Sequence, residues 1–74
     1  MFEKIQKIIA EQLYIDSSSI TEETKFIDDL GADSLDIVQM LIAMEKTFEI
    51  SFGEDEIAEI KTVGDAKRLI EKKI

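Results

Sequence analysis

Apolar side chains in this chain recur every three or four residues, and no segment alternates apolar and polar residues for long enough to form a strand. The clearest case is residues 2–14, where the spacing predicts an amphipathic helix with one apolar stripe formed by Phe2, Ile5, Ile9 and Leu13. The polar run over residues 16–19 ends it, because short polar side chains compete for backbone hydrogen bonds. The periodicity therefore favours an all-α fold.

Three further helices are predicted downstream. A helix over residues 34–48 carries an apolar stripe with helical spacing, while Ile37 and Met40 add a second face; the stripe is Leu35, Val38, Leu41, Ile42, Met44 and Phe48. After Gly53, an acidic segment has enough apolar residues for one or two turns. The last helix begins at Thr62, which forms a capping-box pattern with Asp65.

The connection over residues 15–33 follows no period. Its scattered apolar residues, Ile15, Ile20, Phe26, Ile27 and Leu30, suggest an irregular segment held to the core at several points. Loops of this length are uncommon in small domains and are usually functional. The predicted architecture is a small bundle of three main helices plus one short helix, with a long loop between the first two, in a single domain over residues 1–74.

The composition excludes several function classes. The chain has 74 residues, with neither cysteine nor histidine, so disulfides, the usual zinc sites and Ser-His-Asp or Cys-His catalysis are absent. We expect no catalytic residues and no enzyme activity, with the carboxylates acting as solvated charge. No apolar run approaches the roughly 20 residues that span a bilayer, and the charged N-terminus does not resemble an export signal. We therefore expect a cytoplasmic protein without membrane insertion.

Charge is distributed unevenly along the chain. The net charge is −8, and residues 16–60 hold thirteen acidic residues against Lys25 and Lys46. This balance argues against binding to nucleic acid and favours basic protein partners. A cluster of Glu45, Glu49, Glu54, Asp55, Glu56 and Glu59 could hold Ca²⁺ or Mg²⁺ weakly, although solvated repulsion is the expected state and we predict no metal site.

The most distinctive segment runs from Asp28 to Asp36, where a glycine-containing loop brings Ser34 to the start of a helix. Asp33 and Asp36 have capping-box spacing, so the segment can be explained as a simple helix start. Alternatively, a phosphate ester on an exposed Ser34 would lie at the positive end of the helix dipole, beside free N–H groups. Residues alone leave both interpretations open.

The segment from Leu30 to Asp36, followed by Val38, Ala43, Met44, Glu45 and Phe48, closely resembles bacterial acyl carrier protein. The resemblance extends to the first helix and to Lys61-Thr62-Val63, so it covers nearly the whole chain. It implies that Ser34, flanked by Asp33 and Leu35, carries covalent 4′-phosphopantetheine donated by coenzyme A. It also implies an acyl-chain pocket between the helices, with walls from Val38, Ile42, Phe48, Ile57, Ile60 and Ala66.

The same resemblance implies a partner-binding face on the second long helix, formed by Asp33, Asp36, Gln39, Met40 and Glu45. The expected partners are a phosphopantetheinyl transferase (holo-acyl-carrier synthase), a malonyl transferase, and the ketoacyl synthases, reductases and dehydratase of fatty acid synthesis, which would meet a monomeric carrier. The sequence departs from the family at Gln39, Lys46 and Thr47, which make this face less acidic, and at Gly53, where proline is usual. A specialised carrier for a polyketide, aminoacyl or lipid-modification pathway, or an acidic adaptor without a prosthetic group, remain alternatives.

Overall fold

A computed structural model describes all 74 residues and contains four α-helices, one short 3-10 turn and no β-strand. The elements are α1 (Phe2–Leu13), η1 (Ser17–Ser19), α2 (Ser34–Phe48), α3 (Glu54–Glu59) and α4 (Val63–Lys73). The predicted class, three main helices and one short helix, is confirmed, as are the bounds of α2. No helix is both long and apolar enough to cross a bilayer.

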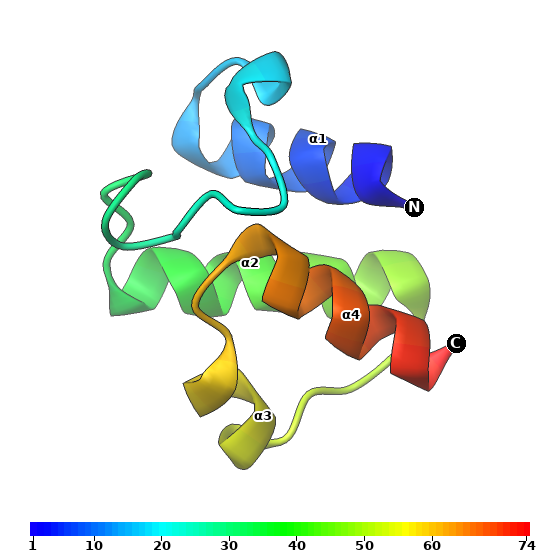
Figure 1. Cartoon of the computed structure of the whole chain (residues 1–74). Coiled ribbons are helices and arrows are strands. Elements are labelled where there is room, and N and C mark those ends of the chain that lie inside the picture. The colour runs from blue at the N-terminus through cyan, green and yellow to red at the C-terminus, as the bar shows by residue number, and fades with distance from the viewer.

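The helices are arranged around α2, which runs through the middle of the molecule in Figure 1. α1 lies along one side of α2 and packs mainly against it, α4 crosses in front, and α3 lies at the edge (Figure 1). The loop between α1 and α2 runs back along the bundle before α2 starts. Both termini lie at the same side of the molecule, which leaves the start of α2 at the opposite side (Figure 1).

The core draws on every long helix and on the long loop. Its buried apolar residues are Ile5, Ile9, Ile20, Phe26, Ala32, Met40, Leu41, Met44, Ile60, Val63, Ala66 and Ile70. The loop supplies three of these, so the prediction that it is held to the core is confirmed for Ile20 and Phe26. It is wrong for Ile27, which is 63% exposed. Phe26 points inward and its neighbour therefore points outward.

The apolar stripe predicted for α2 is confirmed for Leu41 and Met44, which are buried, and for Phe48, which packs against the core. It is wrong for Leu35, Val38 and Ile42, which are 64%, 42% and 45% exposed, whereas Met40 of the predicted second face is fully buried. Since α2 carries apolar residues on two faces, periodicity alone could not select the inward one. The face that Met40, Leu41 and Met44 share belongs to the same core cluster as buried residues of α1 and α4, and α1 packs directly against α2.

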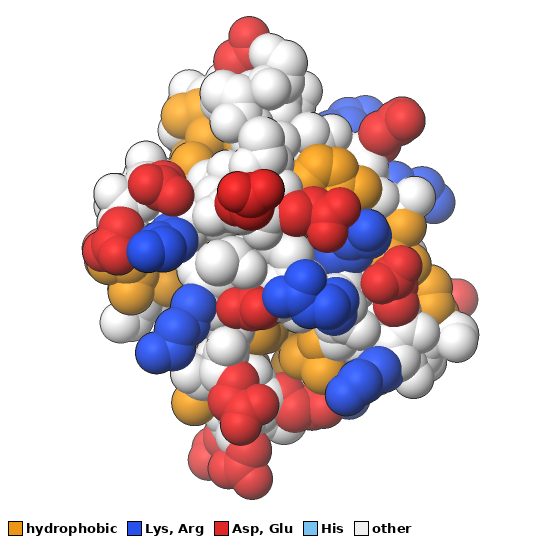
Figure 2. All heavy atoms as spheres, in the orientation of Figure 1, with side chains coloured by type: hydrophobic (Ala, Val, Ile, Leu, Met, Phe, Trp, Pro, Cys, Tyr) orange, Lys and Arg blue, Asp and Glu red, His pale blue; other side chains and the backbone are white.

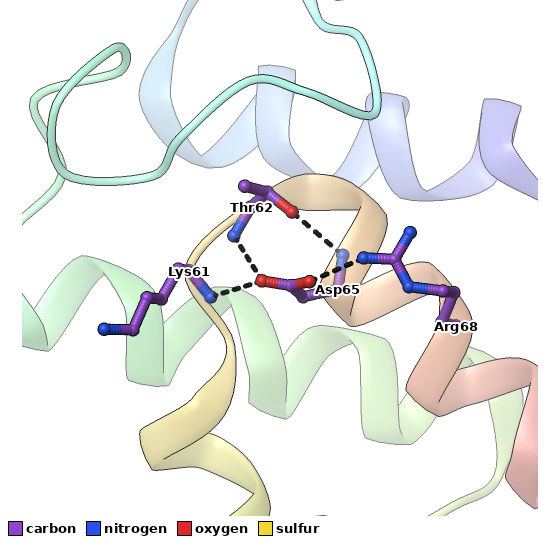
Figure 3. A network of polar contacts seen from close by, with 4 residues as sticks. All are labelled: Lys61, Thr62, Asp65 and Arg68. Atoms are coloured by element: carbon purple, nitrogen blue, oxygen red, sulfur yellow. Dashed lines mark hydrogen bonds and ion pairs between the residues drawn. The ribbon is translucent and has the colours of Figure 1, made fainter.

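Both predicted capping boxes are present. At α2, Asp33 Oδ1 accepts from the Asp36 N–H at 2.9 Å, and Asp36 Oδ2 accepts from the Asp33 N–H at 3.3 Å. At α4, Thr62 Oγ1 accepts from the Asp65 N–H, and the Asp65 carboxylate accepts from the N–H groups of Thr62 and Lys61 and pairs with Arg68 (Figure 3). The backbone hydrogen bond from Thr62 is the main cause that lowers the pKa of Asp65 below its ordinary value.

Helices α1 and α2 both end at a residue with left-handed backbone, and neither is glycine. Tyr14 has φ 58° and Glu49 has φ 56°. A side chain with a Cβ adopts this conformation at a cost of about 1 kcal/mol. Gly31, with φ 67°, occupies a similar conformation in the loop before α2 without that cost.

The loop meets α4 at a very close backbone approach. The N–H of Gly64 donates to the carbonyl of Glu22 at 2.8 Å, and a Cβ at position 64 would lie 2.8 Å from that same oxygen. The contact is reinforced by an ion pair between Lys67 Nζ and Glu22 Oε2 at 3.1 Å. Any side chain at position 64 would therefore press against the backbone of the loop, and glycine is the residue that fits there.

Candidate functional site

Ser34 is the first residue of α2 and is exposed to solvent. Its hydroxyl makes no hydrogen bond within the protein, because the cap of α2 is formed by the side chains of Asp33 and Asp36. The N–H groups of Ser34 and Leu35 have no acceptor in the protein, as is usual for the first turn of a helix. The site therefore offers a free nucleophilic oxygen beside unpaired donors at the positive end of α2.

A mostly apolar hollow of about 540 Å³ opens next to this serine. It lies between the long loop, the first turns of α2, and α3 with the segment that follows it. Its lining residues are Lys25, Phe26, Ile27, Asp28, Ser34, Ile37, Val38, Ile57, Ala58, Ile60 and Lys61. Because Ser34 is itself one of the lining residues, an extended apolar group attached to Ser34 could enter this hollow directly.

The hollow agrees in part with the predicted acyl-chain walls. Val38, Ile57 and Ile60 line it, whereas Ile42, Phe48 and Ala66 do not. Ile42 is exposed further along α2 and Phe48 is that helix's last residue, while Ala66 is fully buried in the core. These three residues therefore lie outside this hollow, and their place in the acyl-chain pocket stays a prediction.

Sequence reasoning missed the loop side of the hollow, which Phe26, Ile27 and Asp28 provide. It also missed Ile37 and Ala58. The scattered apolar residues of the loop were the signal that could have indicated this side. A loop that is held to the core beside the start of a helix forms one wall of any hollow at that helix start. The signal did not show which of Phe26 and Ile27 would point inward.

The predicted partner face is less uniform than the sequence suggested. Asp33 and Gln39 are exposed, and Asp36 and Glu45 are half-buried. Met40 is fully buried, so its assignment to this face is wrong. It lies on the side of α2 that packs into the core. Glu45 Oε2 accepts from the N–H of Phe52 at 2.7 Å, so this carboxylate also fixes the segment before α3.

The exposed side of α2 instead carries three residues of the predicted apolar stripe. Leu35, Val38 and Ile42 lie three and four residues apart and share one face of the helix. They begin one residue after Ser34. An exposed apolar row with acidic neighbours is typical of a surface that binds other proteins.

Four of the nine basic residues, Lys67, Arg68, Lys72 and Lys73, lie on α4. Acidic side chains crowd the lower end of the face in Figure 2, where α3 lies. All three ion pairs use a base of α4: Lys67 with Glu22, Arg68 with Asp65, and Lys73 with Glu56. A hydrogen bond from the N–H of Gly53 chiefly, and from Lys73, lowers the pKa of Glu56. No three acidic side chains gather closely enough to hold a metal ion, so the cluster considered for Ca²⁺ or Mg²⁺ does not form.

Known proteins provide an independent comparison. Residues 3–70 match the family described as phosphopantetheine attachment site. An acyl carrier protein of Clostridium acetobutylicum is 49% identical over 70 residues, which cover 95% of this chain and 91% of that protein.

Solved structures agree with this match. A Mycobacterium tuberculosis protein described as an acyl carrier protein has 33% identity and a TM-score of 0.89, with 97% of each chain covered. The acyl carrier protein of Enterococcus faecalis has 27% identity and a TM-score of 0.83, with 99% of this chain and 92% of that chain covered.

Proposed function

This chain belongs to the acyl carrier protein family, whose members carry 4′-phosphopantetheine and are carriers rather than enzymes, and from that membership we propose that Ser34 bears the prosthetic group here. The observation that carries the proposal is the combination of a free Ser34 hydroxyl with an adjoining apolar hollow. An adaptor without a prosthetic group is excluded by the family match.

The residues around Ser34 fit the group. Its oxygen is exposed and unbonded, so it can be esterified without breaking a contact of the fold. The unpaired N–H groups of Ser34 and Leu35 lie at the positive end of α2, which favours a phosphate. When bound, the group supplies the thiol that the chain itself lacks and on which acyl groups are carried. Phe26, Val38 and Ile60 then offer apolar surface to the acyl chain.

The proposed pathway is fatty acid synthesis in the cytoplasm. The partners would be a phosphopantetheinyl transferase, a malonyl transferase, and the ketoacyl synthases, reductases and dehydratase of that pathway. Asp33 and Asp36 would face basic residues on these enzymes, while Leu35, Val38 and Ile42 would supply apolar contact. The full-length similarity to a protein named acyl carrier protein supports this assignment.

A specialised carrier for a polyketide, aminoacyl or lipid-modification pathway is the second candidate. It is favoured by Gln39 and Lys46, which are both exposed on α2 and reduce the negative charge of the partner face. Loading separates the two candidates. A malonyl transferase of fatty acid synthesis should load the holo protein much faster than it loads a carrier from an unrelated pathway. Equal loading rates for the two carriers would contradict the fatty acid assignment.

The attachment site is tested by intact mass after the apo protein is incubated with coenzyme A and a broad-specificity phosphopantetheinyl transferase. Wild type should gain one phosphopantetheine and Ser34→Ala none. Ser51→Ala is the matched control, because Ser51 is an exposed serine in the segment between α2 and α3, and it should be modified like wild type. Modification of Ser34→Ala, or none of wild type, would overturn the proposal.

A further inference from the structure

Two lysines are among the residues that line the hollow beside Ser34. They are Lys25 and Lys61, which are both exposed, and neither forms an ion pair within the protein. This distinguishes them from most bases of α4, which are paired with carboxylates. Two unpaired cationic side chains that belong to the lining of an apolar cavity are available for an anionic ligand.

The backbone holds these two lysines on adjoining segments. The Phe26 N–H donates to the Lys61 carbonyl at 3.1 Å, and Lys25 forms a bridge with Thr62. The Phe26 carbonyl in turn accepts from the Ala32 N–H at 2.9 Å, two residues before Ser34. A short series of backbone hydrogen bonds therefore links both lysines to the loop that positions the serine.

Neither lysine side chain makes a hydrogen bond or an ion pair within the protein. The backbone N–H of Lys25 donates to Asp29 Oδ2 at 2.8 Å and that of Lys61 to Asp65 Oδ2 at 3.0 Å, so both residues stabilise the fold through their backbone. Figure 3 shows the Lys61 side chain extending away from the Asp65 network. A change at either ammonium group should leave the local backbone intact.

The surroundings of Ser34 make such cations useful. Asp28 lines the same hollow, and Asp33 and Asp36 cap the helix that Ser34 begins. A phosphodiester at Ser34 would place another negative charge among these carboxylates, in a chain whose net charge is already −8. The free N–H groups at the start of α2 offset part of this repulsion, and Lys25 and Lys61 are the positively charged side chains that share the hollow with Ser34.

We propose that Lys25 and Lys61 form an anion-binding subsite for the phosphodiester that links the prosthetic arm to Ser34. This inference rests on the proposed attachment at Ser34. The two ammonium groups neutralise the phosphodiester and hold the root of the arm at the mouth of the hollow. The attached acyl group then starts from the place where the apolar walls are accessible.

The test compares apo and holo forms of wild type, the double variant Lys25→Gln/Lys61→Gln, and the control Lys4→Gln/Lys7→Gln. The control removes the same charge from exposed positions of α1 that make no ion pair. Intact mass first establishes that each holo form carries one phosphopantetheine. Thermal unfolding and the ³¹P chemical shift of the phosphodiester are then measured at low and high salt.

The holo-minus-apo difference in Tm should be about 2–4 °C smaller in Lys25→Gln/Lys61→Gln than in wild type at low salt. It should be unchanged in the control, restored in Lys25→Arg/Lys61→Arg, and equal for all variants at 1 M salt, where charges are screened within about 3 Å. The ³¹P shift should depend on salt in wild type, in the control Lys4→Gln/Lys7→Gln and in Lys25→Arg/Lys61→Arg, and it should not depend on salt in Lys25→Gln/Lys61→Gln.

The outcomes separate the two proposals. Absence of a mass gain in wild type would overturn the attachment at Ser34 itself. A mass gain in every variant, with the same Tm difference and the same ³¹P shift in Lys25→Gln/Lys61→Gln as in wild type, would overturn the anion subsite and leave the attachment standing.

Discussion

The side-chain amide of Gln12 on α1 donates a hydrogen bond of 2.6 Å to Oε1 of Gln39 on α2. Gln39 is where the resemblance led us to expect an acid, so the substitution Gln39→Glu should keep an acceptor for Gln12 and add one negative charge to the partner face. The free energy of unfolding should change by less than about 0.5 kcal/mol. Association with a basic partner enzyme should become faster at low salt and return to the wild-type rate at high salt. Stopped-flow binding at two salt concentrations measures this, and an unchanged rate would remove Gln39 from the face.

The Glu45 carboxylate connects α2 to the segment before α3 through the N–H of Phe52. Glu45→Ala should cost about 1–2 kcal/mol, because a half-buried N–H loses its acceptor. Glu45→Gln retains an acceptor oxygen and should cost less. Urea unfolding gives the energies, and hydrogen exchange at the Phe52 amide reports the site. Equal exchange at this amide in Glu45→Ala and wild type would show that the bond contributes nothing.

The capping carboxylate of Asp65 makes the start of α4 sensitive to acid. Its pKa is lowered chiefly by the backbone hydrogen bond from Thr62, so the folded state favours the charged form. The stabilisation is therefore present above the ordinary pKa of an aspartate and is lost as pH falls through the lowered value. Asp65→Asn should be less stable than wild type at pH 7 by about 1 kcal/mol. The difference should shrink below about pH 4. Thermal unfolding across pH checks the convergence, and a constant difference would contradict it.

Gly64 lies where α4 receives the loop at Glu22. Although alanine is the better helix former, by about 1 kcal/mol, Gly64→Ala should destabilise the protein by about 1–2 kcal/mol, because its Cβ would press on a backbone oxygen that cannot rotate away. Gly53→Ala is the control, since its Cβ would meet only the Glu56 side chain at an ordinary 3.5 Å. Chemical denaturation of both variants provides the comparison. A Gly64→Ala variant as stable as wild type would show that the approach relaxes freely.

The two sides of α2 should respond differently to the same chemical change. Ile42→Ser, at an exposed position, should leave stability within about 0.5 kcal/mol and weaken binding to a partner enzyme. Met44→Ser, at a fully buried position, should cost at least about 2 kcal/mol. Unfolding and binding assays on the same samples separate the two effects. A large loss of stability in Ile42→Ser would restore it to the core.

These contrasts indicate what the sequence could predict. The N-terminal ends of α2 and α4 were predictable because capping by Asp33 with Asp36, and by Thr62 with Asp65, depends on residues three apart. The inward face of α2 was not, because Val38 and Met40 satisfy the same helical periodicity and only the packing of distant helices distinguishes them. Capping patterns, which involve residues close in sequence, therefore predicted where these helices begin, whereas the inward face depends on contacts between distant segments.

The candidate site shows the same division. Ser34 at the first turn of α2 followed from the capping pattern, whereas the walls of the hollow depend on which loop residues fold against the helix. Phe26 and Lys61 meet there through a backbone hydrogen bond between residues that are far apart in sequence. No periodicity within either segment encodes that contact. The position of Ser34 was therefore accessible to sequence reasoning, and the loop side of the hollow was not.

The left-handed ends of α1 and α2 bear on how readily the protein can change shape. Tyr14 and Glu49 together remove about 2 kcal/mol from the stability that two glycines at these positions would provide. Domains of this size are stable by only several kcal/mol, so this loss is a sizeable share of the total. Neither residue lines the hollow beside Ser34. Because the margin that holds the native state is small, two helix ends outside the hollow help to set how readily the bundle opens.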